Sequence, residues 1–224
     1  MIVCLFDIDG TLIYTSGAGR AAMESALVEE FSLPRLVNGV PMSGRTDRAI
    51  ARDLFHAHQL EDSPQNWQRF LAAYMRILPQ FLAGRAGRVL PGIASFLDQL
   101  SARSDVAVGL LTGNVESGAR VKLEYYRIFQ HFRFGGFGDV HFDRNDVARE
   151  ALAEVRRHCR APVDLADVWV IGDTPLDVRC ARAIGARSVA VATGGHSTDE
   201  LAPEQPDLLL RDLSDPQPLV RQWG

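Results

Sequence analysis

Three kinds of sequence pattern are scarce in this chain of 224 residues, and each shortage excludes a class of protein. The three cysteines, Cys4, Cys159 and Cys180, are odd in number, far apart and outside any Cys-x-x-Cys pair. We therefore expect buried thiols rather than disulfides or a zinc site. The formal charge is −4 and no long basic run occurs, so electrostatics gives nucleic-acid binding no support.

Long apolar runs are also missing. The longest cover only a few residues, whereas a helix needs ~20 apolar residues to cross a bilayer, so we expect no membrane span. The N-terminus leads directly into the apolar residues 2–6, without a basic leader or a small-residue cleavage site. From these patterns we expect a soluble, cytoplasmic protein.

The composition that remains is that of a folded domain. Hydrophobic residues make up 46% of the chain and charged residues 23%, which is typical of a globular protein with a sizeable core. The length exceeds the usual size of one core but falls short of two. We therefore expect one large domain with a smaller one inserted or appended.

Four short apolar runs predict buried parallel strands, at residues 2–7, 106–111, 168–171 and 188–192. Helical patterns at about 92–103, 114–127, 143–159 and 176–185 alternate with the later runs. A further apolar run at 207–210 is a candidate edge strand. The predicted fold class is α/β, with a Rossmann-like parallel sheet that binds ligands at the carboxyl ends of its strands.

Residues 16–86 break this alternation, because their patterns predict only helices, at about 19–31, 46–58 and 64–84. The α/β pattern resumes after the turn at residues 89–92. We therefore expect an α-helical cap domain at 16–86, inserted into a Rossmann-like core made of residues 1–15 and 87–224.

The end of the first predicted strand carries the sequence Asp7-Ile8-Asp9-Gly10-Thr11. One carboxylate can attack phosphorus while the other donates a proton to the leaving oxygen and later takes one from water. Gly10 allows the backbone to turn close to a ligand. The pattern suits phosphoryl transfer, with an acidic turn as the structural alternative.

Asp173 follows another buried run, and Asp177 lies four residues later at a helix start. With Asp7 they predict a cluster of acids whose charges would repel unless a cation lies among them. Mg²⁺ fits, because it prefers hard oxygen ligands and keeps positions for water and phosphate. Asp177 could instead only cap the helix.

A candidate phosphate cradle follows the strand at 106–111, where Thr112, Gly113 and Asn114 precede a helix and offer a hydroxyl and free amides. Lys122 lies further along this helix and is the only lysine, against 23 arginines. A compact ammonium is a better point charge than a guanidinium where a phosphate and an acidic nucleophile meet. We predict that Lys122 belongs to the site.

Taken in order, Asp-x-Asp-Gly-Thr, a strand-end Thr-Gly, a lysine and Gly-Asp-x-x-x-Asp resemble the haloacid dehalogenase superfamily, most closely its phosphoglycolate-phosphatase-like members with a helical cap. The resemblance implies a Mg²⁺-dependent phosphatase that forms an aspartyl-phosphate. It assigns the following roles: Asp7 as nucleophile, Asp9 as general acid and base, Thr112 and Lys122 as phosphate grips, and Asp7, Asp9, Asp173 and Asp177 as the metal site. Gly10, Thr11, Gly113 and Asn114 are the expected substrate-binding residues.

Single residues separate this reading from other reactions of the superfamily. Dehalogenases proper lack an aspartate at the position of Asp9, and phosphonoacetaldehyde hydrolases use a cap lysine that residues 16–86 do not contain. A sugar phosphomutase and a non-catalytic phosphate-binding member stay open as alternatives. The expected partner is a small phosphorylated metabolite, and the chain is a monomer or a homodimer.

Two arginines are further candidates for residues of the site. Arg45 lies in a polar turn of the predicted cap and could reach a substrate anion. Arg144 could orient the Lys122 end of the site, while its neighbour Asp143 is expected to cap the helix that follows.

Overall fold

The computed structural model describes residues 1–37, 39–159 and 162–223. Its centre is a six-stranded parallel sheet in the order β5-β4-β1-β6-β7-β8. The strands are β1 (Ile2–Phe6), β4 (Val106–Leu111), β5 (Gly135–Gly136), β6 (Val168–Gly172), β7 (Arg187–Val191) and β8 (Leu208–Leu210). The predicted α/β fold is confirmed, and so are the four strands expected in the core and the edge strand near residue 208.

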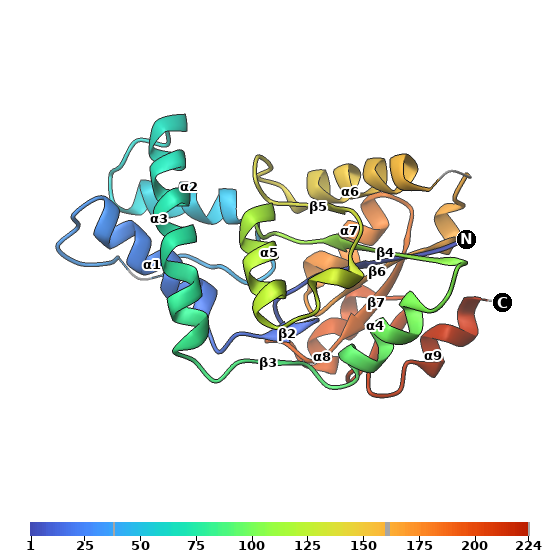
Figure 1. Ribbon diagram of the computed structural model, residues 1–224. Helices are drawn as coiled ribbons and strands as arrows, with labels where there is room; N and C mark the ends of the chain where they lie inside the picture. Colours follow the sequence, from blue (N-terminus) through green and yellow to red (C-terminus); the bar gives the residue numbers. More distant parts are fainter. Residues whose placement is uncertain (38, 160–161, 224) are drawn as a thin grey trace.

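Helices cover both faces of this sheet (Figure 1). One face packs against α4 (Ile93–Ser101), α5 (Glu116–Tyr125) and α9 (Gln217–Val220), and the other against α6 (Arg144–His158) and α7 (Pro175–Ala183). The short α8 (Thr198–Leu201) adjoins β7 and α7. Four 3₁₀ turns complete the described part of the core, at Phe129–His131, Leu165–Asp167, Ala202–Glu204 and Arg221–Trp223.

The burial of the central strand β1 explains why Asp7, the first charged residue of the chain, lies at the carboxyl end of the strand. Cys4 and Phe6 point into one apolar cluster and Val3 and Leu5 into the other, as the period of two in a strand requires. A strand buried on both faces leaves no place for a charge until it ends, which it does at Asp7. The three cysteines are buried free thiols, as expected.

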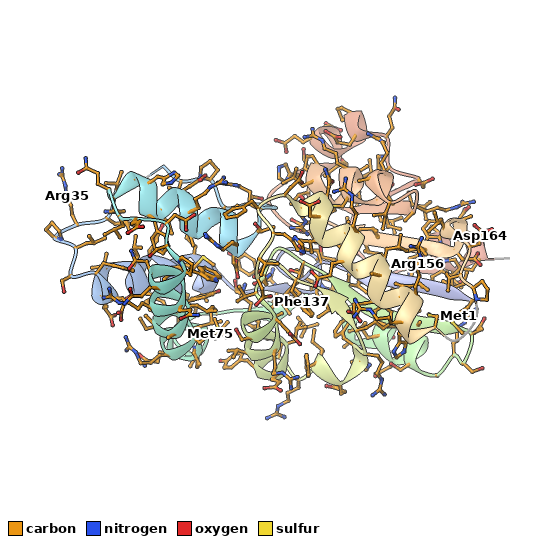
Figure 2. The ribbon with its side chains drawn as sticks, turned by 90° about the horizontal axis from the view of Figure 1, so that it is seen from above. Met1, Arg35, Met75, Phe137, Arg156 and Asp164 are labelled. Carbon is orange, nitrogen blue, oxygen red and sulfur yellow. The ribbon has the colours of Figure 1, made fainter. Side chains whose placement is uncertain are left out.

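Between β1 and α4 the chain forms α1 (Ala18–Glu30), α2 (Asp47–Ala57) and α3 (Pro64–Ala83), which bury an apolar cluster of their own. This helical unit stands at one end of the sheet in Figure 1. Seen from above in Figure 2, Arg35 marks its outer end, Met1 and Asp164 lie at the far end of the core, and Phe137 lies between the two units. In the described ranges, the helices are too short or too polar to span a bilayer.

Three short strands were not predicted. The pair β2 (Ile13–Tyr14) and β3 (Arg88–Val89) is an antiparallel ribbon of two residues a side, too short to show a period in the sequence. The strand β5 consists of two glycines, a residue type that strands disfavour. A Cβ at Gly136 would lie 2.5 Å from the carbonyl oxygen of Val147, so this glycine permits α6 to pack tightly on the sheet.

Candidate active site

The loop after β1 brings two carboxylates to the carboxyl edge of the sheet. The Asp7 backbone N–H donates to the carbonyl of Ile171 in β6, at 2.9 Å, which fixes the nucleophile candidate between the two central strands. The chain then turns through Gly10, whose φ of +88° favours glycine. A Cβ at Gly10 would lie 2.4 Å from Asp173 Oδ2, so a larger residue would displace that carboxylate.

Asp7, Asp173 and Asp177 form a buried cluster in which one oxygen of each carboxylate lies within 4.8 Å of the others. Burial and mutual repulsion raise the pKa of Asp7 to about 6 and hold that of Asp173 well above its ordinary range. The Thr11 hydroxyl donates to Asp173 Oδ1 at 3.1 Å. Such a cluster requires positive charge close by.

Part of this charge comes from Arg144, the first residue of α6. Its Nη2 lies 2.8 Å from Asp7 Oδ1 and 2.5 Å from Asp177 Oδ1, and its side chain is buried with theirs. Asp177 also caps α7, because its Oδ2 accepts hydrogen bonds from the backbone N–H and the hydroxyl of Thr174, at 3.0 and 2.8 Å. The cap that the sequence left as an alternative for Asp177 is present, and it is compatible with a place in the acidic cluster.

The charge balance of this cluster tests whether Mg²⁺ fits. Three buried carboxylates and one guanidinium leave two negative charges, which matches one divalent cation. The donors are carboxylate oxygens, the ligands that Mg²⁺ prefers. Asp7, Asp173 and Asp177 are therefore suited to hold it.

A second polar group lies beside the first and contains the only lysine. The Nζ of Lys122 lies 2.6 Å from Asp9 Oδ2 and 2.6 Å from Asn114 Oδ1. Asn114 Nδ2 in turn donates to Asp9 Oδ2, at 3.0 Å, and to the Thr112 hydroxyl, at 2.8 Å. Asp9 accepts from these two donors through Oδ2, and its side chain is 39% exposed, as proton exchange with a substrate requires.

Both groups face one cavity of about 380 Å³ between the core and the helical unit. Its core wall includes Asp7, Asp9, Asn114, Lys122, Arg144 and Asp173. Its opposite wall combines the apolar side chains of Met23, Met42 and Ile50 and the ring of Tyr74 with charged residues, among them Arg20, Arg45 and Asp47. A polar floor facing a partly apolar roof suits a small molecule with a charged end.

The sequence pattern of haloacid dehalogenase-like hydrolases matches residues 4–182, a range that includes both polar groups and the helical unit. This chain belongs to that family. It is 31% identical to the phosphoglycolate phosphatase of Synechococcus elongatus, over 96% of this chain and 95% of the relative. It is 30% identical to the phosphoglycolate phosphatase of Rhodospirillum rubrum, over 88% of this chain and 82% of the relative.

The fold agrees with this membership. The structure of CbbY from Rhodobacter sphaeroides in complex with phosphate aligns with a TM-score of 0.75 at 19% identity, covering 96% of each chain. The predicted resemblance to phosphoglycolate-phosphatase-like members of the superfamily is confirmed, and the chain is a phosphatase of this family.

In this haloacid dehalogenase-like hydrolase, several predicted site residues act through others. Thr11 and Thr112 are buried behind the residues that line the cavity, and their hydroxyls bond Asp173 and Asn114. The guanidinium of Arg45 is 2.6 Å from Asp53 and also donates to a cap carbonyl, so in this arrangement it is held within the helical unit. Its contact with a substrate stays a prediction.

Arg144 lies at a different end of the site from the one that the sequence suggested. The sequence offered it as a residue that could orient the Lys122 end, but the structure places its guanidinium on Asp7 and Asp177, while Asp143 caps α6 as expected. A weak signal existed, because a cation at the first position of a helix opposes the helix dipole and needs another reason to be there.

The helical unit contacts the core through the segment before and at the start of α2. The backbone N–H of Asp47 donates to the carbonyl of Gly113 at 2.7 Å, and its Oδ2 accepts from the Val115 N–H at 2.9 Å. Gly113 permits this approach, because a Cβ there would lie 2.0 Å from the Arg45 carbonyl oxygen. Arg144 Nη1 adds a hydrogen bond to the carbonyl of Gly44, at 3.0 Å.

Proposed function

We propose that this phosphatase is a Mg²⁺-dependent phosphohydrolase that cleaves small phosphomonoesters through an aspartyl-phosphate on Asp7. The observation that carries the proposal is the position of Asp7, which faces the cavity with Asp173 and Asp177 beside it. Because Arg144 binds Asp7 Oδ1, Oδ2 is the oxygen left to attack phosphorus. The guanidinium thus orients the nucleophile.

The metal would be held by Asp7, Asp173 and Asp177. When bound, it supplies positive charge against which phosphoryl oxygens and the attacking carboxylate can approach each other. Whether Asp9 also contributes a ligand stays part of the proposal, since its carboxylate pairs with Lys122. Lys122, with Thr112, Gly113 and Asn114 around it, would hold the phosphoryl oxygens.

Asp9 is the proposed general acid and base. It would protonate the departing alcohol as Asp7 forms its bond to phosphorus, and then take a proton from the water that releases phosphate. The ammonium of Lys122, at 2.6 Å, would hold the Asp9 carboxylate in place between these two proton transfers.

We further propose that residues 16–86 act as a cap that opens to admit substrate and closes during the reaction. Support comes from the hydrogen bonds between the units, which join backbone groups of residues 44–48 to the carbonyls of Gly113 and Gly138 and to the Arg144 side chain. Closing would exclude water from the phosphoryl group and bring the apolar side chains of the opposite wall against the leaving alcohol.

Phosphate release from a panel of phosphomonoesters tests the reaction class. The panel comprises phosphoglycolate, which the named relatives suggest, with sugar phosphates and nucleotides. We expect release with Mg²⁺ and its loss with EDTA, restored by excess Mg²⁺. Asp173→Asn should need far more Mg²⁺ than wild type. Isomerisation of a sugar phosphate without release would indicate a mutase, and binding without turnover a non-catalytic member.

A pH profile tests the closing of the cap. Burial raises the pKa of Asp47 to about 7 in the closed arrangement, whereas an exposed aspartate has a pKa of ~3.9. Closing therefore takes up a proton, so it is favoured at low pH and opposed as pH rises through about 7. We expect closure to weaken roughly tenfold between pH 6 and pH 8.

Asp47→Asn isolates this effect, because asparagine keeps an oxygen that can accept from Val115 N–H but does not titrate. The ratio of kcat/KM of the variant to that of wild type should rise with pH through about 7. Taking the ratio cancels the titration of the substrate and of Asp7. A ratio that is flat from pH 5 to pH 9 would rule out Asp47 as a group that couples protonation to closure.

A further inference from the structure

Tyr74 of α3 is a buried polar residue that the proposed mechanism does not use. It is 1% exposed, stacks on Phe70 with ring centroids 6.2 Å apart, and lines the cavity on the cap side. Its hydroxyl oxygen lies 3.7 Å from the place where a Cβ of Gly19 would stand, and Lys122 Nζ lies 3.1 Å from the same place. The hydroxyl and the Lys122–Asp9 pair are therefore neighbours across the cavity.

The hydroxyl of Tyr74 makes no hydrogen bond to any residue that the structure describes. Within those residues, seven side chains bury an unpaired polar atom, and two of them, Tyr74 and Arg144, line the cavity. Arg144 binds carboxylates through Nη2 and the Gly44 carbonyl through Nη1, and only its Nε is unpaired. A buried hydroxyl without a partner costs free energy, so a ligand in the cavity is its natural partner.

The phenol keeps its proton, so it can donate a hydrogen bond to an oxygen atom of a ligand. Burial, together with the negative charges of Asp47 and Asp9, holds the pKa of Tyr74 well above its ordinary value. The O–H is therefore retained at all physiological pH values.

The charges around the cavity decide what kind of oxygen it meets. Each basic side chain that lines the cavity is already paired with a carboxylate, in the pairs Arg20–Glu24, Arg45–Asp53, Lys122–Asp9 and Arg144–Asp7. Asp47 has no ion-pair partner among the described residues and accepts only the Val115 N–H with its carboxylate. A second negative charge on the leaving group would find no free cation here.

We propose that Tyr74 determines specificity by donating a hydrogen bond to an uncharged hydroxyl of the leaving alcohol, so that the preferred substrates are phosphomonoesters of small polyols. The inference rests on the proposed function. The carbon chain of the alcohol packs against Met23, Met42 and Ile50, and its hydroxyl occupies the space beside Tyr74. Specificity for the leaving group thus comes from one polar contact, at Tyr74, beside apolar side chains of the cavity.

Two substrates of equal size test this contact. 2-Hydroxyethyl phosphate and n-propyl phosphate differ by a hydroxyl in place of a methyl group. We expect wild type to prefer the hydroxyl compound. Tyr74→Phe should lower kcat/KM for it by roughly tenfold and change that for n-propyl phosphate by less than about twofold. Equal changes with both compounds, or no change with either, would overturn the inference.

A rival hypothesis is that Arg20 leaves Glu24 and binds a carboxylate on the leaving group. Phosphoglycolate, as a third substrate, and the variant Arg20→Gln test this hypothesis. If phosphoglycolate is the best of the three compounds, and Arg20→Gln lowers kcat/KM for phosphoglycolate but not for the other two, the cap recognises a carboxylate and our inference is wrong.

Tyr74→Phe should also melt at or above the wild-type temperature, because it removes an unpaired buried hydroxyl. A lower melting temperature would assign that hydroxyl a structural role. A wild type that releases phosphate from none of a wide panel overturns the proposed function itself.

Discussion

Asp7→Asn should abolish phosphate release, lowering kcat by roughly 10⁴-fold or more. The amide has the shape of the carboxylate but no negative oxygen with which to attack phosphorus. Arg144 keeps Asp177 as a partner at 2.5 Å, so the surroundings of the substitution stay in place. The measurement is phosphate release under single-turnover and steady-state conditions at saturating Mg²⁺, with the best substrate of the panel.

Two controls separate loss of the nucleophile from loss of the fold. Asp143→Asn changes an aspartate next to Arg144 that only caps α6, a task asparagine performs equally well, so its activity should equal that of wild type. Asp7→Asn should melt no lower than wild type without metal, since it removes one of three mutually repelling carboxylates. Substantial turnover by Asp7→Asn would mean that another residue attacks phosphorus.

The fold was predictable because its core strands are buried on both faces. Such strands appear in a sequence as continuous apolar runs, and each here ends at a polar residue that belongs to the sheet edge, as β1 does at Asp7 and β6 near Asp173. The strand β5 could not be found in this way, because Gly135 and Gly136 carry no side chains and owe their pairing to neighbours distant in sequence.

The site was only partly predictable, for a reason visible in its two cations. Lys122 is the single lysine among arginines and therefore attracts notice, whereas Arg144 is one of 23 arginines and sits after an ordinary helix cap. Its role depends on the approach of α6 to α7, which brings residues 144 and 177 together. Contacts of that kind follow from packing between elements and leave no local pattern.

The same limit applies to the helical unit of α1, α2 and α3. Its helices follow from apolar periodicity, but the choice of groups that face the cavity depends on how the unit packs against the core. Arg45 was a reasonable candidate from its turn, and the structure ties it to Asp53; Tyr74 reads in sequence as one more core aromatic of α3. Only the packed arrangement reveals that its hydroxyl lacks a partner in the part of the chain that the structure describes.

Arg144→Gln should lower the free energy of unfolding by about 3–5 kcal/mol at neutral pH without metal. The guanidinium is the cation in direct contact with Asp7 and Asp177, and all three side chains are at least 94% buried. Without it, the pKa of Asp7, which burial already raises, rises further in the folded state, because Arg144 is a cause that lowers it. The contribution of Asp7 to stability is then retained at low pH and lost as pH rises through the raised value, so the difference from wild type should shrink between pH 7.5 and pH 5.

Urea denaturation in EDTA at these two pH values measures the effect, and Arg149→Gln provides the matched control. Arg149 lies on the same helix and pairs with Asp146, but its side chain is 60% exposed, so its loss should cost less than about 1 kcal/mol at either pH. Mg²⁺ should recover part of the stability of Arg144→Gln, because a divalent cation among Asp7, Asp173 and Asp177 replaces some of the lost positive charge. If Arg144→Gln and Arg149→Gln unfold at the same urea concentration, the acidic cluster does not depend on Arg144 for its charge balance. The argument that the two residual negative charges of the cluster match one Mg²⁺ would then lose its basis.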